Sequence, residues 1–187
     1  MVQAWYMDNA GSNEKAENHK NPPEFVSLQE LFKKTGVEYY KLNLASLDSD
    51  GILEKLKTQR GYTYEDQVTI RPTPDKLEEF EKKLKIFYTE HLHTDEEIRL
   101  CVEGAGYFDV RDKGDDWIRV RVDPGDLLII PAGIYHRFTV DDNKYIVAKR
   151  FFVGEPVWTP HNRPADEIEA RKDYIDKLQN GKFVIAN

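Results

Sequence analysis

The chain of 187 residues is short of cysteine and of positive charge, and each shortage excludes a class of protein. Its single cysteine, Cys101, cannot form an intramolecular disulfide, so the fold does not depend on an oxidising compartment. The 34 acidic residues outnumber the 27 basic ones and give a formal net charge of -7 at pH 7. This balance argues against a broad basic surface for nucleic acid or anionic membranes.

Long apolar runs are also missing. No stretch approaches the roughly 20 apolar residues that a membrane span requires. Residues 1–8 contain neither a basic segment nor a long apolar one of the kind found in secretory signals. We therefore expect no membrane insertion and a protein that stays where it is made. Its 40% of hydrophobic residues is enough for one core, and we expect a single domain over residues 1–187.

The first half of the chain carries helical signals. Ser27 and Glu30 match a capping box that opens a short helix, and Gly36 is the expected stop. Thr73 followed by Pro74 is a second helix start, because a capping residue precedes a proline. We also expect a strand, a further helix and a C-terminal helix, which lie in this order at residues 37–42, 50–57 and 166–178.

The second half has a different pattern, with short alternating strands separated by turn clusters rich in Gly, Pro, Asp and Asn. These clusters lie at residues 112–115, 123–126, 131–133 and 141–143. Their spacing is typical of a β-sandwich or barrel. We expect a mainly β (α+β) fold in which helices of the N-terminal third and the C-terminus pack outside a barrel. The expected parts are a mixed lead-in over 1–85, a barrel core over 86–153, and a loop and helix over 154–187.

Three histidines and one glutamate have the spacing of a metal site. His91 and His93 are two residues apart, so on an extended strand both imidazoles project from the same face. Glu97 adds a carboxylate and completes the donor set that non-haem Fe(II) enzymes use. His136 follows the turn at 131–133 and could supply a fourth ligand.

The same residues belong to two longer patterns. From His91 the chain follows His-X-His-X3-Glu-X6-Gly, which ends at Gly104. From Gly125 it follows Gly-X5-Pro-X-Gly-X2-His, which ends at His136. Together they are similar to the two motifs of the cupins, and this resemblance implies a jelly-roll β-barrel with the metal site inside.

Further stretches narrow the resemblance to one family. Residues 91–99 and 130–139 are similar to acireductone dioxygenases of the cupin superfamily, in particular to the eukaryotic type. The other stretches that carry this likeness are 4–8, 104–111, 151–160 and 162–164. Because they span nearly the whole chain, the protein is identified as a member of this family.

The resemblance implies a metal-dependent dioxygenase of methionine salvage. Such an enzyme converts acireductone (1,2-dihydroxy-5-methylthiopent-1-en-3-one) and O2 to 4-methylthio-2-oxobutanoate and formate with Fe(II). With Ni(II) the products are 3-methylthiopropanoate, formate and carbon monoxide. The resemblance implies one ion per chain, Fe(II) or alternatively Ni(II), held by His91, His93, Glu97 and His136, with open positions for the substrate.

Strand alternation indicates which side chains share a cavity with the ligands. If Glu97 points inward, Arg99 and Cys101 do so too. Arg150 shares a face with two apolar residues before it, and the resemblance places that face inside. It also makes Arg99 and Arg150 the cations that contact the anionic enediol. The rest of the expected substrate pocket is Phe87, Cys101, Phe108, Phe138, Ile146 and Ala148.

Several of these residues have simpler interpretations. Arg99 could form a salt bridge alone, and Arg150 is open to the same alternative. Glu96 could orient a histidine or accept a substrate proton, but it could equally face water. For His19 and His161 we expect solvated or hydrogen-bonded side chains without a catalytic role.

The resemblance also bears on partners and location. It implies acireductone and O2 as the small-molecule partners of the protein. We expect a monomer that binds no nucleic acid. Eukaryotic members have been linked to the cytoplasmic tail of a membrane-type matrix metalloproteinase and to the nucleus. We therefore expect a cytoplasmic protein that is also nuclear. The alternative function is another metal-dependent cupin enzyme, an isomerase or a different dioxygenase.

Overall fold

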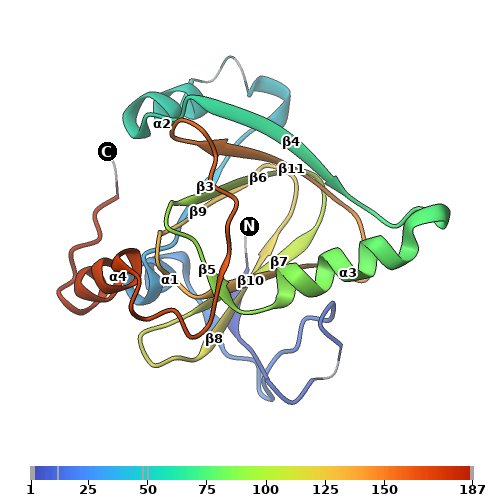
Figure 1. Cartoon of the computed structure of the whole chain (residues 1–187), viewed down its shortest axis with the longest axis horizontal. Coiled ribbons are helices and arrows are strands. Elements are labelled where there is room, and N and C mark those ends of the chain that lie inside the picture. Colours follow the sequence, from blue (N-terminus) through green and yellow to red (C-terminus); the bar gives the residue numbers. More distant parts are fainter. Residues whose placement is uncertain (1–2, 12, 48, 50, 186–187) are drawn as a thin grey trace.

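Two antiparallel sheets face each other and enclose the centre of the protein (Figure 1). The computed structural model describes residues 3–11, 13–47, 49 and 51–185. One sheet has the order β12 (His161–Asn162), β5 (His91–Leu92), β10 (His136–Val140), β7 (Gly106–Arg111), β8 (Trp117–Val122), β1 (Ala4–Tyr6) and β2 (Phe25–Val26). The other has the order β3 (Glu38–Lys41), β9 (Asp126–Ile130), β6 (Glu97–Gly104), β11 (Ile146–Phe152) and β4 (Tyr64–Ile70).

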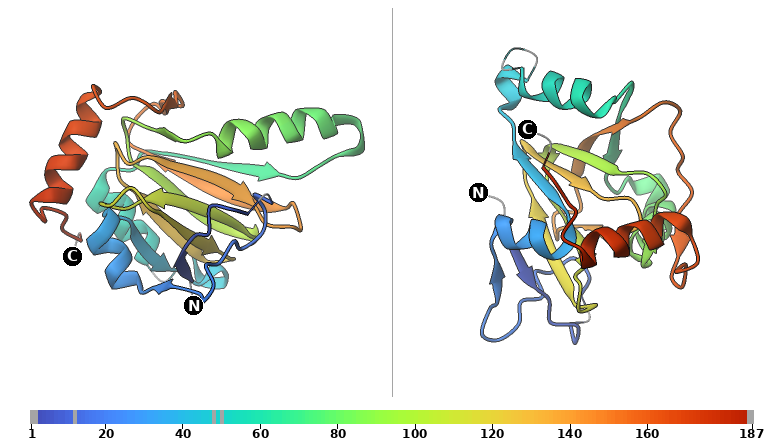
Figure 2. Two further views of the ribbon diagram at one scale, coloured as in Figure 1. Left: turned by 90° about the horizontal axis from the view of Figure 1, so that it is seen from below. Right: turned by 90° about the vertical axis from the view of Figure 1, so that its left-hand side faces the viewer.

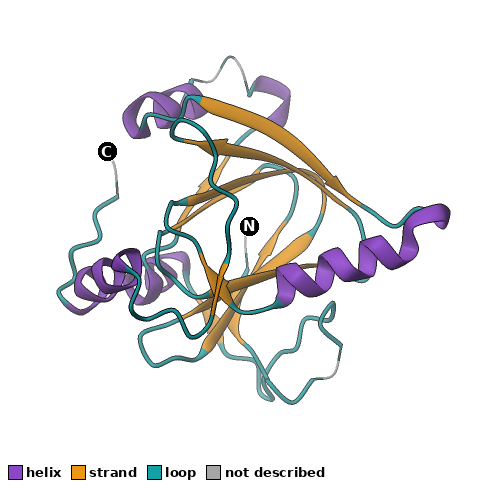
Figure 3. Ribbon diagram, in the orientation of Figure 1, coloured by secondary structure: helices purple, strands orange, loops and turns teal. Residues whose placement is uncertain are grey.

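Helices surround the strands, which occupy the centre of the molecule (Figure 3). They are α1 (Leu28–Thr35), α2 (Ile52–Arg60), α3 (Leu77–Tyr88) and α4 (Glu169–Gln179), with 3-10 turns η1 (Leu44–Ser46) and η2 (Pro74–Lys76). α3 packs along β10, and Figures 1 and 2 place α3 and α4 on opposite sides of the sheets. The expected mainly β fold with peripheral helices is confirmed. No helix in the described part of the chain is long and apolar enough to cross a membrane.

The five-stranded sheet is apolar on both faces because successive side chains alternate between two clusters. In β9, Leu127 and Ile129 pack outward with Leu53 of α2. Leu128 and Ile130 point the other way, into the main core between the sheets. A strand buried on both faces has a continuous apolar sequence, which explains the run over residues 127–130.

Local helix signals act as expected. The Ser27 hydroxyl accepts a hydrogen bond from the Glu30 amide at 3.2 Å, and the Glu30 carboxylate accepts one from the Ser27 amide at 3.0 Å. Gly36 ends α1 in the left-handed conformation, at a φ of 75°. Pro74 opens η2, and α3 follows it. The helix expected at 50–57 corresponds to α2, although residue 50 itself lies outside the described residues.

The N-terminal third contributes more than outer helices. β1 and β2 extend the seven-stranded sheet, and β3 and β4 form the two edges of the five-stranded sheet. β4 pairs with β11 along its whole length. Its apolar residues are interrupted by Glu65, Asp66 and Gln67, as an edge strand tolerates, so its sequence lacks a clear strand signal. Strands from residues 1–85 are therefore part of the sheets themselves.

A buried group of charges joins three strands of the seven-stranded sheet. The Asp109 carboxylate of β7 accepts hydrogen bonds from Arg119 at 2.7 and 2.8 Å and from Arg137 at 2.8 Å. The exposed fraction is 0% for Arg119 and 1% for Asp109. Arg119 also donates to the backbone carbonyls of Glu14 and Ala16. The group thus anchors the N-terminal loop to β8 and holds the Arg137 side chain of β10.

Candidate metal centre and substrate cavity

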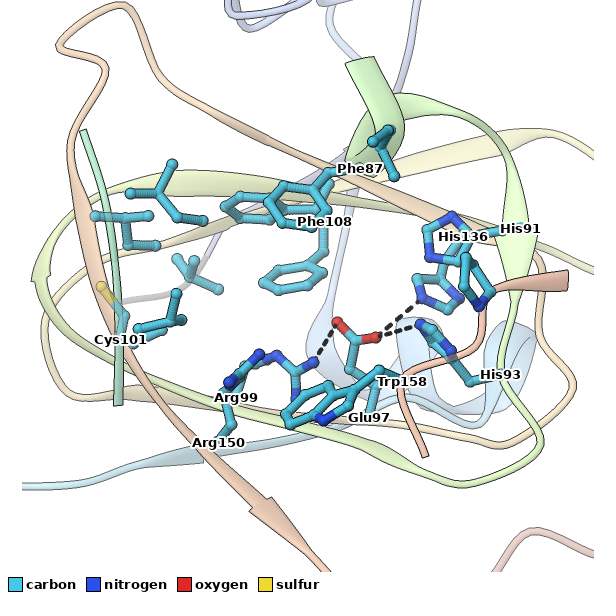
Figure 4. A pocket seen from close by; sticks show the side chains of 18 residues that line it. Phe87, His91, His93, Glu97, Arg99, Cys101, Phe108, His136, Arg150 and Trp158 are labelled. Atoms are coloured by element: carbon cyan, nitrogen blue, oxygen red, sulfur yellow. Dashed lines mark hydrogen bonds and ion pairs between the residues drawn. The ribbon is translucent and has the colours of Figure 1, made fainter. Parts of the chain in front are cut away.

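Three histidines converge because two short segments meet at one edge of the seven-stranded sheet. His136 of β10 pairs directly with His91 of β5, and His93 follows β5 at once. Their ligand atoms all lie within 4.8 Å of one another. Figure 4 shows the three rings grouped at one end of a pocket. This arrangement can hold one metal ion.

The two-residue strand β5 is held in place by a network around the preceding carboxylate. Glu90 accepts hydrogen bonds from Arg111 at 2.9 and 3.0 Å and from Arg163 at 2.8 Å. On the other side, the Gly133 amide donates to the His93 carbonyl at 2.9 Å. Gly133 has a φ of +82°, and a Cβ there would lie 2.0 Å from a backbone oxygen of α4. The turn before His136 therefore requires glycine.

The orientation of the imidazoles leaves one ring nitrogen of each histidine available to a metal. His91 and His136 each approach, through Nδ1, the carbonyl oxygen two residues earlier, at 2.6 and 3.0 Å. The Nδ1 of His93 lies 3.2 Å from the carbonyl of Thr159. Because a carbonyl oxygen only accepts, each Nδ1 carries the proton, and the Nε2 of a neutral ring keeps a free lone pair.

Glu97 adds a carboxylate to this group. Its Oε2 lies 3.2 Å from the Nε2 of His93 and 3.3 Å from that of His136. Without a metal, a proton on either Nε2 can form a hydrogen bond to the Glu97 carboxylate. With both nitrogens unprotonated, all three groups are acceptors, and a metal cation among them would satisfy all three. A divalent transition metal with mixed nitrogen and oxygen ligands fits this donor set.

The surroundings set the protonation states of the ligands. Burial, reinforced by the nearby His136, lowers the pKa of His91 to about 4. Burial opposes ionisation of Glu97, but the charge of Arg99 and the hydrogen bonds from His136 and His93 outweigh it and hold its pKa well below the usual value. Burial would lower the pKa of His93, yet Glu97 raises it. At neutral pH His91 is neutral and Glu97 is ionised, as metal ligation requires.

The histidines open onto a cavity of about 310 Å³. In Figure 4, the histidines lie at one end and Cys101 at the other, with Phe87 and Phe108 along one wall and Arg99 and Arg150 on the facing wall. The Phe108 and Phe138 rings pack with centroids 4.8 Å apart. The sequence-predicted residues that the structure brings to this cavity are Phe87, His91, His93, Glu97, Arg99, Cys101, Phe108, His136, Phe138, Ile146, Ala148 and Arg150.

The two arginines of the cavity have different partners. Arg99 donates from Nη1 to the carbonyl of Ile98 at 2.9 Å, and its Nη2 lies 3.5 Å from Oε1 of Glu97. Burial lowers the pKa of Arg99, although Glu97 opposes this shift. Arg150 instead forms two hydrogen bonds with Asp66, at 2.7 and 2.5 Å. Of the two, Arg99 is the cation next to Glu97.

Glu96 is not brought to the cavity. Its carboxylate accepts hydrogen bonds from Arg60 at 2.9 Å and from Tyr62 at 3.1 Å, on the opposite face of the sheet from Glu97. Adjacent residues at the start of a strand point to opposite faces, and the same alternation that turns Glu97 inward turns Glu96 outward. His19 and His161 also lie elsewhere: His19 packs on the Trp5 ring at 4.4 Å, and His161 belongs to β12.

Some lining residues carry no local signal in the sequence. Val68 and Ile70 come from β4, and Trp158 and Pro160 from the loop after β11. They reach the cavity through long-range strand pairing and loop placement rather than through a motif. The remaining lining residues that sequence reasoning missed are Ile86 and Val122.

Cys101 should be unreactive in the folded protein. Its side chain is buried, and burial raises the pKa of the thiol to about 12. Since only the thiolate attacks alkylating reagents, iodoacetamide at pH 8 should leave the native protein unmodified and modify it once in urea. Mass spectrometry measures the added mass, and the single cysteine leaves no ambiguity about the site. Rapid modification of native protein would show that the cavity end is open.

Comparison with known proteins places the chain in one group. The sequence model of the ARD/ARD' family matches residues 3–160. The chain is 56% identical over 187 residues to a Drosophila melanogaster protein named acireductone dioxygenase, covering 100% of this chain and 99% of that protein. It is 50% identical over 177 residues to acireductone dioxygenase 1 of Physcomitrium patens, covering 95% of this chain and 90% of that protein.

A solved structure supports the fold. It is an acireductone dioxygenase from Bacillus anthracis with a cadmium ion in its active centre, and it matches with a TM-score of 0.67 and 24% sequence identity. The match covers 86% of this chain and 97% of the other. The expected cupin-type barrel is thereby confirmed.

Proposed function

The chain belongs to the ARD/ARD' family, and we propose that it is a metal-dependent dioxygenase that acts on acireductone in methionine salvage. One observation carries the proposal: three histidines and Glu97 converge at one end of a cavity, with Arg99 beside them and mostly apolar side chains beyond. This places donors for a metal and a fixed positive charge next to space for an uncharged tail.

The cavity suits a small anion with an apolar tail. Its volume of about 310 Å³ is at the lower end of the range for small-molecule pockets. The enediol end of acireductone is anionic and needs compensation away from water. We place this end at the metal and Arg99, and the methylthio tail between the phenylalanines and the aliphatic residues beyond them.

We assign His91, His93, Glu97 and His136 as the ligands of one ion. When bound, such an ion would supply Lewis acidity and a template for the enediolate and O2. Arg99 directs its guanidinium to the charge on the substrate, and its bond to the Ile98 carbonyl limits the rotation of the group. The phenylalanine wall excludes water from the reacting end.

The product is proposed to depend on the metal. From the family resemblance, Fe(II) leads to 4-methylthio-2-oxobutanoate and formate, and Ni(II) leads to 3-methylthiopropanoate, formate and carbon monoxide. Histidine and carboxylate ligands suit both metals, so the donor set supports either form.

Product analysis tests the proposal directly. Apo-protein is reloaded separately with Fe(II) or Ni(II) and mixed with acireductone and O2, and mass spectrometry identifies the products against a metal-free control. We expect the two product sets above, each formed faster than the spontaneous reaction. No acceleration with either metal in folded, loaded protein would move the function to another substrate. Oxygen uptake that depends on a different substrate would then favour the alternative cupin enzyme.

Location and partners stay predictions from the resemblance. These are a monomer in the cytoplasm and nucleus, and binding to the cytoplasmic tail of a membrane-type matrix metalloproteinase. A pull-down with that tail checks the last point. Binding that survives loss of the metal ligands would make the interaction independent of catalysis.

A further inference from the structure

A row of charges crosses the five-stranded sheet on its cavity face. Arg150 of β11 is the direct cross-strand neighbour of Arg99 on β6 and of Asp66 on β4. Two like charges placed directly opposite each other destabilise a sheet and repel within a low-dielectric cavity. The pair of arginines therefore needs a nearby negative charge.

Asp66 supplies that charge to Arg150 in an oriented way. Its two carboxylate oxygens accept from Nε and Nη2 of Arg150 at 2.7 and 2.5 Å, and Tyr64 donates to one of them at 3.3 Å. The guanidinium of Arg150 lies over the Trp158 ring, 3.8 Å from its centroid. Both side chains of the ion pair are about three-quarters buried. This clamp fixes the Arg150 guanidinium on two sides.

The contacts of Arg99 are looser than those of Arg150. Its guanidinium donates to the Ile98 carbonyl, lies 3.5 Å from Oε1 of Glu97, and has the Phe152 ring centroid 5.7 Å away. Asp66 and Glu97 balance Arg150 and Arg99, so a bound divalent cation leaves the group with two positive charges. A doubly charged anion such as an enediolate matches this excess.

We propose that Asp66 is a positioning residue of the cavity: it holds Arg150 against Trp158 and away from Glu97, which leaves Arg99 as the cation available to an anionic substrate. The substrate part of this inference rests on the proposed function, whereas the effect on the metal site does not. The sequence-based expectation that Arg150 contacts the substrate is replaced here by a supporting role.

The geometry explains what loss of Asp66 would do. Glu97 lies two residues before Arg99 on the same face of β6, so it is a diagonal neighbour of Arg150. Diagonal neighbours in an antiparallel pair are roughly 7–8 Å apart, within reach of a long side chain. A released Arg150 is drawn to the Glu97 carboxylate and competes with the metal for it.

The test uses Asp66→Asn, Arg150→Gln and the double variant. Ni(II) affinity of the apo-protein is measured by isothermal titration calorimetry, and kcat/KM is measured with acireductone. Asp66→Asn should weaken Ni(II) binding and lower kcat/KM by roughly 10-fold each, a coupling usual for contacting residues. Arg150→Gln should reduce Ni(II) affinity and kcat/KM by less than Asp66→Asn does. The double variant should recover Ni(II) affinity to within about 3-fold of Arg150→Gln.

Two further variants separate positioning from general stability. Asp66→Glu keeps the carboxylate and should retain Ni(II) affinity to within about 3-fold. Glu65→Gln is the matched control, since Glu65 is the preceding residue of β4 and pairs with Lys57 and Lys149 away from the cavity. It should change neither readout beyond about 2-fold.

Three results overturn the proposal. They are unchanged Ni(II) affinity in Asp66→Asn, a double variant as weak as Asp66→Asn, and a larger loss of kcat/KM in Arg150→Gln than in Asp66→Asn. The last would make Arg150 the substrate cation. If the unaltered protein does not turn over acireductone, the proposed function fails, and the Ni(II) titrations still decide the role of Asp66.

Discussion

Replacing His91 with alanine should remove the bound metal and with it oxygen-dependent turnover. His91 supplies one of three nitrogens that lie within 4.8 Å of one another, and its partner across the strands is His136. Even residues that only orient a ligand change metal affinity by roughly 10- to 100-fold, so loss of a ligand should exceed about 100-fold. Metal content by mass spectrometry and oxygen uptake measure the two effects.

The control for this variant is His161→Asn. His161 lies on β12, which pairs with β5, but it does not belong to the histidine cluster. It should retain bound metal and turnover, which separates the loss of a ligand from damage to this edge of the sheet. Full turnover by metal-free His91→Ala protein would refute the metal-centred function.

Replacing Asp109 with alanine should cost about 3–5 kcal/mol of unfolding free energy, as expected when one partner of a buried ion pair is removed. The carboxylate binds Arg119, whose exposed fraction is 0%, and also Arg137. Without it, two arginines remain among buried groups with no carboxylate between them. Since a domain of this size is stable by only about 5–15 kcal/mol, the loss is a large share. Urea unfolding followed by circular dichroism measures it.

Glu78→Ala is the comparison for the buried pair. Glu78 and Lys82 form an exposed ion pair on α3, with side chains 85% and 72% accessible. Exposed pairs contribute little, so the urea midpoint should stay where it is. Equal shifts in the urea midpoint for both variants would show that burial does not account for the contribution of the Asp109 ion pairs to the free energy of unfolding.

The convergence of the histidines and Glu97 could be predicted because their geometry is local. On a strand, side chains two residues apart share a face, and this alone brings His91 and His93 together. The glycine-containing turn before His136 predicts the start of β10. The same alternation predicts that Arg99 and Cys101 follow Glu97 into the cavity, as they do. The capping box at Ser27 is local in the same sense.

The partners of Glu96 and the hydrogen bonds that hold Arg150 show where local reasoning stops. Strand alternation turns Glu96 away from Glu97, but its partners Arg60 and Tyr62 lie 36 and 34 positions earlier and follow from no local pattern. Asp66 is 84 positions from Arg150. It lies among other polar residues of β4, so the sequence gives no reason to single it out. Such pairings depend on which strands become neighbours in the sheet. The local sequence around either residue of a pair does not indicate its partner.

Residue spacing was sufficient to predict the convergence of the histidines with Glu97 and the type of barrel, since both follow from the two-residue period of a strand and from turn residues at set intervals. The pairing of charges around Arg99 and Arg150, and the residues that form the cavity walls, could be identified only from the tertiary structure. They arise where β4, β6 and β11 lie side by side, and hydrogen bonding between strands far apart in sequence determines that order.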